Sequence, residues 1–310
     1  IDFPEEEVDF IEDGHVNERV DAIAGELEAL SRNAMRGKVL RDGLTVVLVG
    51  SPNVGKSSLM NALAREDVAI VTDIAGTTRD AVDTPFEIGE KKYIIIDTAG
   101  MRRQRSVENN SVEDYSVMRS IWAVSRADVV VTVLDATQPV SEQDVRIAGY
   151  VAEEGKPGII AVNKWDAVEK DGFTAIDYEK KLREQFSFMD YLVPVFVSAK
   201  SGLRIDKLLA LSEKVYKNAS QRIATGTLND VVADAIAATE PPSKHGRRLK
   251  IYYATQPDVC PPKFVFFVND ATLVHFSYKR YLENALRRAF DFSGTPIRLV
   301  FNSKKEDDGI

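Results

Sequence analysis

A phosphate-binding loop is the clearest chemical feature of the sequence. Residues 50–57 read Gly-Ser-Pro-Asn-Val-Gly-Lys-Ser, directly after the apolar run 44–49 and before a helix-forming stretch at 58–64. The glycines let successive backbone N–H groups point at phosphate oxygens, and the N-terminus of the following helix adds positive partial charge. We therefore expect Lys56 to reach the outer phosphates of a nucleotide and the Ser57 hydroxyl to bind Mg²⁺.

A second motif, Asp-Thr-Ala-Gly at 97–100, follows another apolar run. A carboxylate at the end of a strand can hold Mg²⁺ through water, and a glycine there can offer its N–H to a γ-phosphate. The pattern is common on its own, but here it follows the phosphate-binding loop at a suitable distance. We therefore expect Asp97 to help bind Mg²⁺ and Gly100 to contact the γ-phosphate.

The sequence Asn-Lys-Trp-Asp at 163–166 indicates which base is bound. The carboxylate of Asp166 can accept hydrogen bonds from guanine N1–H and N2–H₂. Adenine presents an acceptor at N1 and no amine at C2, so it would leave the carboxylate without partners. We expect the stem of Lys164 to cover the base and Asn163 to tie its loop to the phosphate-binding loop.

A further motif, Ser-Ala-Lys at 198–200, ends the last apolar run, where the Ala199 N–H can meet guanine O6. Together the four motifs predict GTP rather than ATP as the ligand. The expected GTP-binding residues are Ser51, Asn53, Val54, Gly55, Lys56, Ser57, Ser58, Asp97, Gly100, Asn163, Lys164, Asp166, Ser198, Ala199 and Lys200.

These motifs can act together only if the fold brings them to one edge of a sheet. The alternation of strand and helix patterns between about 44 and 220 predicts such a fold. The apolar runs that read as buried parallel strands lie at 46–49, 93–96, 129–134, 159–162 and 193–197. Such alternation predicts a doubly wound α/β sheet, whose ligands bind at the carboxyl ends of the strands. Every motif above falls at one of these ends.

Composition narrows the class of protein. The 310 residues are 44% hydrophobic and 28% charged, which is ordinary for a soluble protein of about two domains. No apolar run approaches the roughly 20 residues of a membrane helix, and we expect no membrane partner. The single cysteine excludes an internal disulfide and favours a cytoplasmic location. The net charge of −8 argues against a general polyanion binder, although a local basic surface stays open.

The segment before the phosphate-binding loop differs from the rest. Residues 2–13 are acidic and read as a linker or a strand edge. Apolar residues then recur at three- and four-residue intervals between about 16 and 40, which predicts an amphipathic helix. The face of such a helix must be buried, against the GTPase core, another subunit or a piece of protein absent from the chain.

With these motifs the chain resembles the translation-factor-related GTPases, in the group that contains Der (EngA), MnmE (TrmE) and Era. From about residue 91 onward the resemblance is to Der. It rests on Asp-Thr-Ala-Gly-Met-Arg-Arg at 97–103, Val-Leu-Asp-Ala-Thr-Gln at 133–138, Asn-Lys-Trp-Asp at 163–166 and Pro-Pro-Lys-Phe at 261–264. This resemblance implies a P-loop GTPase fold followed by a KH-like domain.

Residues 1 to about 82 look instead like the tRNA-modification GTPase MnmE. The stretches that carry this resemblance include His-Val-Asn-Glu-Arg-Val at 15–20 and Val-Ala-Ile-Val-Thr-Asp-Ile-Ala-Gly at 68–76. The two resemblances together suggest a hybrid, natural or built, with its seam near 81–90.

The resemblance also implies how hydrolysis proceeds. The loop 72–80 is similar to the first switch of the group, in which Thr78 supplies a Mg²⁺-binding hydroxyl. Met101 stands where Ras-like GTPases carry a Gln that orients the attacking water. A substitute is a K⁺ site that resembles the one of this group, formed by Asn53 and carbonyls of the 73–76 loop. A K⁺ beside the β- and γ-phosphates would neutralise charge that develops in the transition state.

A glutamate beyond the Asp-x-x-Gly motif is thought to assist hydrolysis in MnmE, and Glu113 is its nearest counterpart here. The expected catalytic residues are Asn53, Lys56, Thr78, Gly100 and Glu113. The expected metal ligands are Ser57, Thr78 and Asp97 for Mg²⁺ and Asn53 for K⁺.

The final third predicts a small α+β domain similar to the KH-like domain of Der. Its expected elements are a helix at 228–239, strands at 248–255 and 263–269, a helix at 276–290 and a strand at 297–301. It has no Gly-x-x-Gly loop, by which ordinary KH domains clamp a nucleic-acid backbone. The basic residues Lys244, Arg247, Arg248 and Lys250 could contact rRNA phosphates. The domain could equally serve to dock on the GTPase domain.

We therefore expect three parts: an acidic linker and helix at 1–42, a GTPase domain at 43–222 and a KH-like domain at 223–310. The expected function is a Mg²⁺-dependent, K⁺-stimulated GTPase that acts as a nucleotide switch in assembly of the large ribosomal subunit. Its expected partners are GTP or GDP, the large subunit and its rRNA, and a second GTPase domain in a dimer. Two alternatives stay open, a tRNA-modification GTPase of the MnmE type and a nucleotide-gated binding module with vestigial hydrolysis.

Overall fold

The structure is a computed structural model that describes residues 39, 43–64, 69–70, 83–88, 91–97, 121–244 and 246–303. Contacts divide the chain into two units, 1–43 and 44–310, and every element named below belongs to the second. The linker and amphipathic helix expected at 1–42 lie outside the described residues, apart from Val39. None of the described helices has the length and apolarity needed to cross a bilayer.

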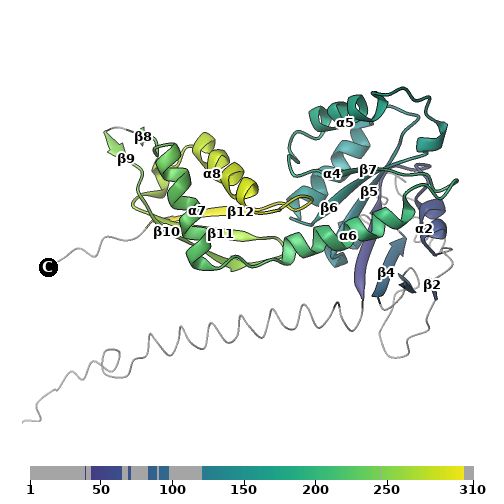
Figure 1. The fold of residues 1–310 in the computed structure, drawn as a ribbon, viewed down its shortest axis with the longest axis horizontal. Helices are drawn as coiled ribbons and strands as arrows, with labels where there is room; N and C mark the ends of the chain where they lie inside the picture. Colours follow the sequence, from purple (N-terminus) through teal and green to yellow (C-terminus); the bar gives the residue numbers. More distant parts are fainter. Residues whose placement is uncertain are drawn as a thin grey trace, which may run out of the picture. The chain divides into compact units, whose positions relative to one another are not determined.

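One sheet organises the first part of the described chain (Figure 1). Its strands lie in the order β2 (Ala69–Ile70), β3 (Asp83–Ile88), β4 (Lys91–Asp97), β1 (Leu44–Val49), β5 (Val129–Asp135), β6 (Gly158–Asn163) and β7 (Pro194–Phe196). Within the run β4-β1-β5-β6-β7, each strand pairs parallel with the next. The α/β fold and the five buried parallel strands expected from the apolar runs are therefore confirmed.

The edge of this sheet differs from the expectation, because β3 pairs antiparallel with β4 and β2 pairs antiparallel with β3. The sheet is therefore mixed. The sequence of β3, Asp-Thr-Pro-Phe-Glu-Ile, has no apolar run, and its Pro85 is typical of strands near a sheet edge. The strand is held by Phe86, which is buried and stacks on Tyr93 of β4 with ring centroids 5.2 Å apart.

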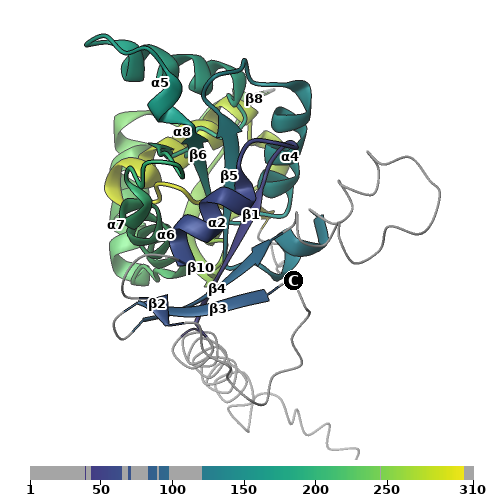
Figure 2. The same ribbon diagram turned by 90° about the vertical axis from the view of Figure 1, so that its right-hand side faces the viewer.

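Helices cover both faces of the sheet. Figure 2 shows α2 (Lys56–Ala64) and α6 (Ile205–Ser220) on one side of β1 and β5, and α4 (Glu142–Glu153) on the other. The residues of β1 are all buried, because this strand lies centrally between the two layers. A further helix, α5 (Thr174–Gln185), contributes Leu182 to the buried cluster that also holds residues of β5, α4 and β6.

The register of the sheet brings the motifs to one edge. Leu48 of β1 lies opposite Asp97 at the end of β4, and Asp135 at the end of β5 lies opposite Asn163 at the end of β6. Because the strands are parallel, their carboxyl ends meet along this edge, where ligands of such sheets bind.

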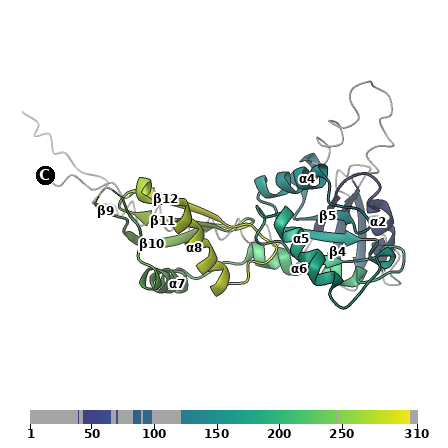
Figure 3. The same ribbon diagram turned by 90° about the horizontal axis from the view of Figure 1, so that it is seen from above.

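The last third folds as a separate α+β layer (Figure 3). Its main elements are α7 (Thr225–Ala238), β10 (Ile251–Asp258), β11 (Lys263–Val268), α8 (Phe276–Ala289) and β12 (Arg298–Ser303). The strands lie in the order β10-β11-β12, antiparallel in the first pair and parallel in the second. The five elements expected here are confirmed, with ends that differ by a few residues.

This smaller sheet has two different faces. Phe264, Phe266 and Val268 alternate along β11 and are buried in one cluster with residues of α7 and α8. Phe267 points to the opposite face, where it stacks on Tyr253 of β10 with ring centroids 4.3 Å apart. A short hairpin of β8 (Ser243–Lys244) and β9 (Arg247–Arg248), which was not expected, precedes β10.

Candidate nucleotide-binding site

The P-loop, residues 50–55 between β1 and α2, depends on two glycines. Gly50 has φ +144° and Gly55 has φ +92°, conformations that L-residues rarely adopt. A Cβ at Gly50 would collide with the carbonyl oxygen of Val133 in β5, and one at Gly55 would collide with the side-chain amide of Asn163. The loop therefore lies against two neighbouring strands, and both approaches require the absence of a side chain.

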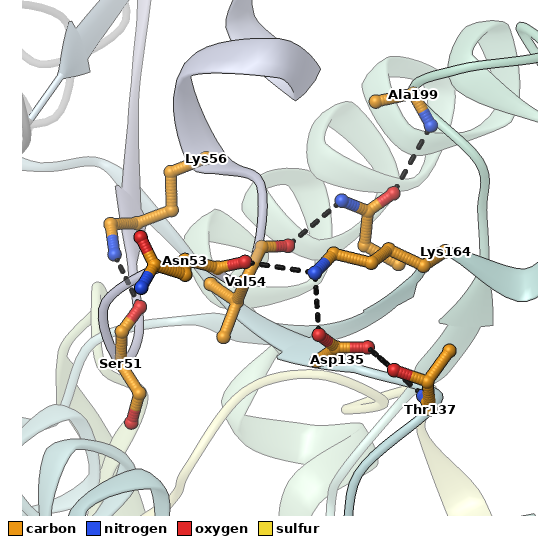
Figure 4. Close-up of polar contacts among 9 residues, drawn as sticks. Ser51, Asn53, Val54, Lys56, Asp135, Thr137, Lys164 and Ala199 are labelled. Carbon is orange, nitrogen blue, oxygen red and sulfur yellow. Dashed lines mark hydrogen bonds and ion pairs between the residues drawn. The ribbon is translucent and has the colours of Figure 1, made fainter.

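Lys56 begins α2 and folds back over the loop (Figure 4). Its ammonium group donates to the carbonyl oxygens of Gly50 and Ser51, each at 2.7 Å. The half-buried Ser57 and the exposed Ser58 follow in the first turn of the same helix. This arrangement concentrates a cation, helix N–H groups and hydroxyls at the mouth of the loop, which is the chemistry that a phosphate chain needs.

The buried side chain of Asn163 joins two loops. Its amide nitrogen donates to the Val54 carbonyl at 2.9 Å, and its amide oxygen accepts from the Ala199 N–H at 3.1 Å. The residue thus holds the P-loop and the 198–200 loop at a fixed separation across the end of β6. In this structure the Ala199 N–H, which we expect to meet guanine O6, is directed to Asn163, and its contact with a base stays a prediction.

Lys164 lies across the same edge in a left-handed backbone conformation, with φ +62°. Its ammonium group donates to the Asn53 carbonyl at 2.9 Å and forms an ion pair with Asp135 at 2.6 Å. Asn53 itself is exposed and also left-handed, with φ +65°. Lys164 therefore spans from the P-loop to the end of β5, with its stem extended between the two.

Asp135 holds Lys164 in place and is itself fixed by Thr137, whose N–H and hydroxyl donate to its other oxygen at 2.9 and 2.6 Å (Figure 4). Only 9% of the Asp135 side chain is exposed. This burial alone would raise the pKa of Asp135, but the hydrogen bonds from Lys164 and Thr137 outweigh it and hold the pKa below its usual value. The carboxylate is therefore ionised at neutral pH and fixes the lysine head.

Asp166 is exposed at the rim of the site, one residue after the buried Trp165. Trp165 packs against Phe196 of β7 with ring centroids 4.3 Å apart, which anchors the loop. The hydroxyl of the fully buried Ser198 donates to Asp166 at 2.6 Å and lowers its pKa. One oxygen of Asp166 is thus oriented by Ser198, while Lys200 beside it is exposed.

Several expected residues cannot be placed. Thr78, Gly100 and Glu113 lie outside the described residues, as do the 73–76 loop and Met101. Of Asp97 the structure describes only the backbone, at the end of β4. Within the described part of the chain, no group of three or more His, Cys, Asp or Glu side chains is arranged to hold a metal ion.

Two acidic residues of the site were not singled out from the sequence. Asp135 lies in the run Val-Leu-Asp-Ala-Thr-Gln at a strand end, and that position was the available signal. Asp144 lies in Ser-Glu-Gln-Asp at 141–144, a spacing that indicates a capping box at a helix N-terminus. Its second partner, Ser51 of the P-loop, leaves no trace in the local sequence.

Comparisons with known families match two separate segments of the chain. Residues 45–164 match the family described as a 50S ribosome-binding GTPase. Residues 222–302 match the family described as the KH-domain-like C-terminal part of EngA bacterial GTPase enzymes. A solved structure of Era from Aquifex aeolicus is a distant likeness, with a TM-score of 0.42 and 21% identity over 85% of this chain and 94% of that one.

Curated relatives match across both parts. GTPase Der of Agathobacter rectalis is 54% identical over 263 residues, which are 85% of this chain and 59% of that protein. GTPase Der of Caldicellulosiruptor saccharolyticus is 48% identical over 293 residues, 94% of this chain and 66% of that protein. The chain thus spans less than two thirds of either relative. With a GTPase segment followed by the EngA-type KH-like segment, it belongs to the Der (EngA) GTPase family.

Proposed function

We propose that the chain binds GTP with Mg²⁺, hydrolyses it to GDP and phosphate, and acts as a nucleotide switch in assembly of the large ribosomal subunit. In this proposal residues 43–222 form the GTPase domain and residues 223–310 the KH-like domain. The proposal concerns the part of Der that this chain spans, and it places the protein in the cytoplasm.

The observation that carries the proposal is the position of Asn163. Its side chain donates to the P-loop at Val54 and accepts from Ala199 in the 198–200 loop. The loop that suits phosphates and the two loops that suit guanine are thereby held together at one sheet edge. A nucleotide with its phosphates on the P-loop would carry its base toward Lys164 and Asp166.

The residues present fit a Mg²⁺ ion. Mg²⁺ in nucleotide sites takes few protein ligands and several waters or phosphate oxygens, so a cluster of carboxylates is not needed. Ser57 presents a hydroxyl in the first turn of α2, next to Lys56, and the end of β4 brings Asp97 beside β1. A bound Mg²⁺ would neutralise charge on the β- and γ-phosphates, while Ser57 and Asp97 hold it and Thr78 completes the expected set.

A K⁺ ion is the finer part of the proposal. Asn53 is exposed in the P-loop with a left-handed backbone, so its side chain is accessible to a second cation. Met101 offers no group to orient a water, which leaves room for K⁺ to supply the missing charge in the transition state. GTP turnover in KCl and in NaCl tests this part, and equal rates would contradict it.

The first third of the chain is the least supported part. Its resemblance to MnmE, the idea of a hybrid and a dimer of GTPase domains stay proposals. The relative from Caldicellulosiruptor spans 94% of the chain, so the match to Der extends into the first third and does not favour a tRNA-modification function.

Co-sedimentation with purified large ribosomal subunits tests the ribosomal role. We expect more protein in the pellet with a non-hydrolysable GTP analogue than with GDP or without nucleotide, because the γ-phosphate orders the switch loops. A Lys56→Ala variant should lose this nucleotide dependence. Pelleting that is absent in every nucleotide state would contradict the ribosomal role, and an absence of GTP turnover would leave a nucleotide-gated binding module.

A further inference from the structure

Two cations of the basic stretch that the sequence singles out, residues 244–250, are paired with carboxylates in the fold. Arg247 forms an ion pair with Asp270 at 3.2 Å, and Arg248 forms one with Glu240 at 2.9 Å. Both acidic partners lie elsewhere in the last third of the chain: Glu240 precedes the β8–β9 hairpin, and Asp270 follows β11. Phosphates that approach this stretch would therefore compete with carboxylates already in place.

A different basic surface lies on α8, here called the α8 face and defined by Lys279, Arg280 and Arg288. All three side chains are exposed, and none forms an ion pair with any residue that the structure describes. The buried residues Tyr278, Leu282, Ala285 and Leu286 lie on the side of the helix that packs on the sheet. Helical geometry then puts Arg280 at the centre of the outer side, with Lys279 and Arg288 flanking it.

The two helices on this sheet carry opposite charge. From Phe276 to Ala289, α8 has four basic residues and one acidic residue, a net charge of +3. From Thr225 to Ala238, α7 has two acidic residues, the exposed Asp230 and Asp234, and no basic one, a net charge of −2. A polyanion is therefore attracted to α8 and repelled from α7, although the whole chain has a net charge of −8.

We infer that the α8 face is a docking surface for the phosphate backbone of RNA. This inference rests on the proposed ribosomal function and adds the surface that contacts rRNA. Its basis is charge complementarity, because three unpaired cations on an exposed helix match a row of phosphates. The last third of the chain lacks the Gly-x-x-Gly loop by which other KH domains hold nucleic acid, so a contact with RNA would have to use a different surface.

An exposed aromatic side chain lies at the N-terminal end of α8, beside the α8 face. Phe276 is 75% exposed, and its ring lies tilted against that of His275, with centroids 4.5 Å apart. Exposed aromatic rings beside cations stack on unpaired bases of RNA. Phe276 therefore extends the α8 face with a base-stacking group, one turn before Arg280.

Two triple variants of the full chain test the inference, because each removes three positive charges. One is K279Q/R280Q/R288Q on the α8 face, and the other is R247Q/R248Q/K250Q on the basic stretch. Binding to protein-free large-subunit rRNA is measured by filter binding at several salt concentrations. We expect the α8 variant to bind about tenfold more weakly or worse, with a salt slope lower by about 2–3, as three lost phosphate contacts require.

The matched variant should stay within about threefold of the parent, because two of its three charges, Arg247 and Arg248, are already paired with carboxylates. A third variant, F276A, should weaken binding several-fold with an unchanged salt slope, since stacking releases few counterions. Unchanged thermal unfolding and GTP turnover show that each variant is folded.

The outcomes separate this inference from the ribosomal role. Equal losses in both triple variants, or a loss only in the 247–250 variant, would overturn the α8 face. A parent chain that binds rRNA through α8 but does not pellet with subunits would uphold the inference and contradict the ribosomal role. Pelleting that depends on α8 while rRNA binding does not would show a protein partner instead, and would overturn the inference.

Discussion

The hydroxyl of Ser51 in the P-loop donates a hydrogen bond of 2.5 Å to the carboxylate of Asp144, which lies 93 positions later in α4. The other oxygen of Asp144 accepts from the Ser141 N–H at 3.0 Å and the Ser141 hydroxyl at 2.7 Å. Asp144 is buried, so these bonds are shielded from water. One carboxylate thus caps a helix and holds the phosphate-binding loop.

Single substitutions can separate these two roles. Ser51→Ala removes the P-loop side of this contact, which is the bond to Asp144 and a longer one of 3.4 Å to the Ser141 hydroxyl, and leaves the cap in place. We therefore expect GTP affinity to fall by about fivefold with little loss of stability. Ser141→Ala removes the helix cap, so we expect the free energy of unfolding to fall by about 1 kcal/mol with little change in affinity. Isothermal calorimetry and urea unfolding measure both. If Ser51→Ala left affinity unchanged, Asp144 would act as a cap alone.

The ion pair of Asp135 with Lys164 predicts a pH dependence. Because the pKa of Asp135 is lowered in the folded protein, the pair stabilises the fold above the usual aspartate pKa of about 4. That contribution is lost as the pH falls through the lower, folded value. We therefore expect Asp135→Asn to lower stability at pH 7 by about 1–2 kcal/mol.

Urea unfolding of parent and variant at pH 7 and near pH 3 measures this difference. The gap should shrink at the lower pH, because pH 3 lies below the usual aspartate pKa, and protonation of Asp135 in the unfolded parent then offsets part of the contribution of the ion pair. Asp171→Asn is a matched control, since Asp171 also has a lowered pKa but bonds only within its own turn, to Phe173 and Thr174. A gap for Asp135→Asn that stayed constant with pH would exclude the ion pair as its cause.

The parallel strands and their motifs could be predicted because each depends on a short, continuous stretch of sequence. The apolar runs that became β1, β5 and β6 end directly before the residues of the site. By contrast, β3 has a proline and a glutamate where an apolar run would be needed, and it is recognised only by its pairing with β4. Local pattern therefore predicted buried strands and missed the antiparallel edge.

Contacts between residues that are far apart in the sequence could not be predicted, for a different reason. The partners of Arg247 and Arg248, Asp270 and Glu240, are brought near by the fold of the C-terminal module, so a run of basic residues gave no sign of its neutralisation. The bond between Ser51 and Asp144 likewise joins residues that are 93 positions apart. They meet because α4 follows β5, which is the neighbour of β1 in the sheet. Only the three-dimensional arrangement distinguishes paired charges from free ones.

The P-loop glycines predict a steric effect on binding. At Gly55, with φ +92°, a Cβ would collide with the Asn163 amide that bonds to Val54. Gly55→Ala should therefore displace Asn163 and lower GTP affinity by about tenfold or more. Gly202→Ala is the matched control, because Gly202 also has positive φ, +74°, but a Cβ there meets nothing within 4 Å. Equal effects on affinity would mean that backbone strain, and not the collision, is responsible.

The base preference can be tested at Asp166. An amide there can accept from xanthine N1–H and donate to the xanthine C2 oxygen, but it opposes the guanine amine. Asp166→Asn should therefore weaken GTP by about 100-fold relative to xanthosine triphosphate, since charge-assisted hydrogen bonds are lost. Ser198→Ala removes the 2.6 Å bond that orients Asp166, together with a 3.1 Å bond from the Ser201 N–H, but keeps the carboxylate, so it should weaken GTP without changing the preferred base. Competition binding of both nucleotides measures this, and a variant that still prefers GTP would show that Asp166 does not select the base.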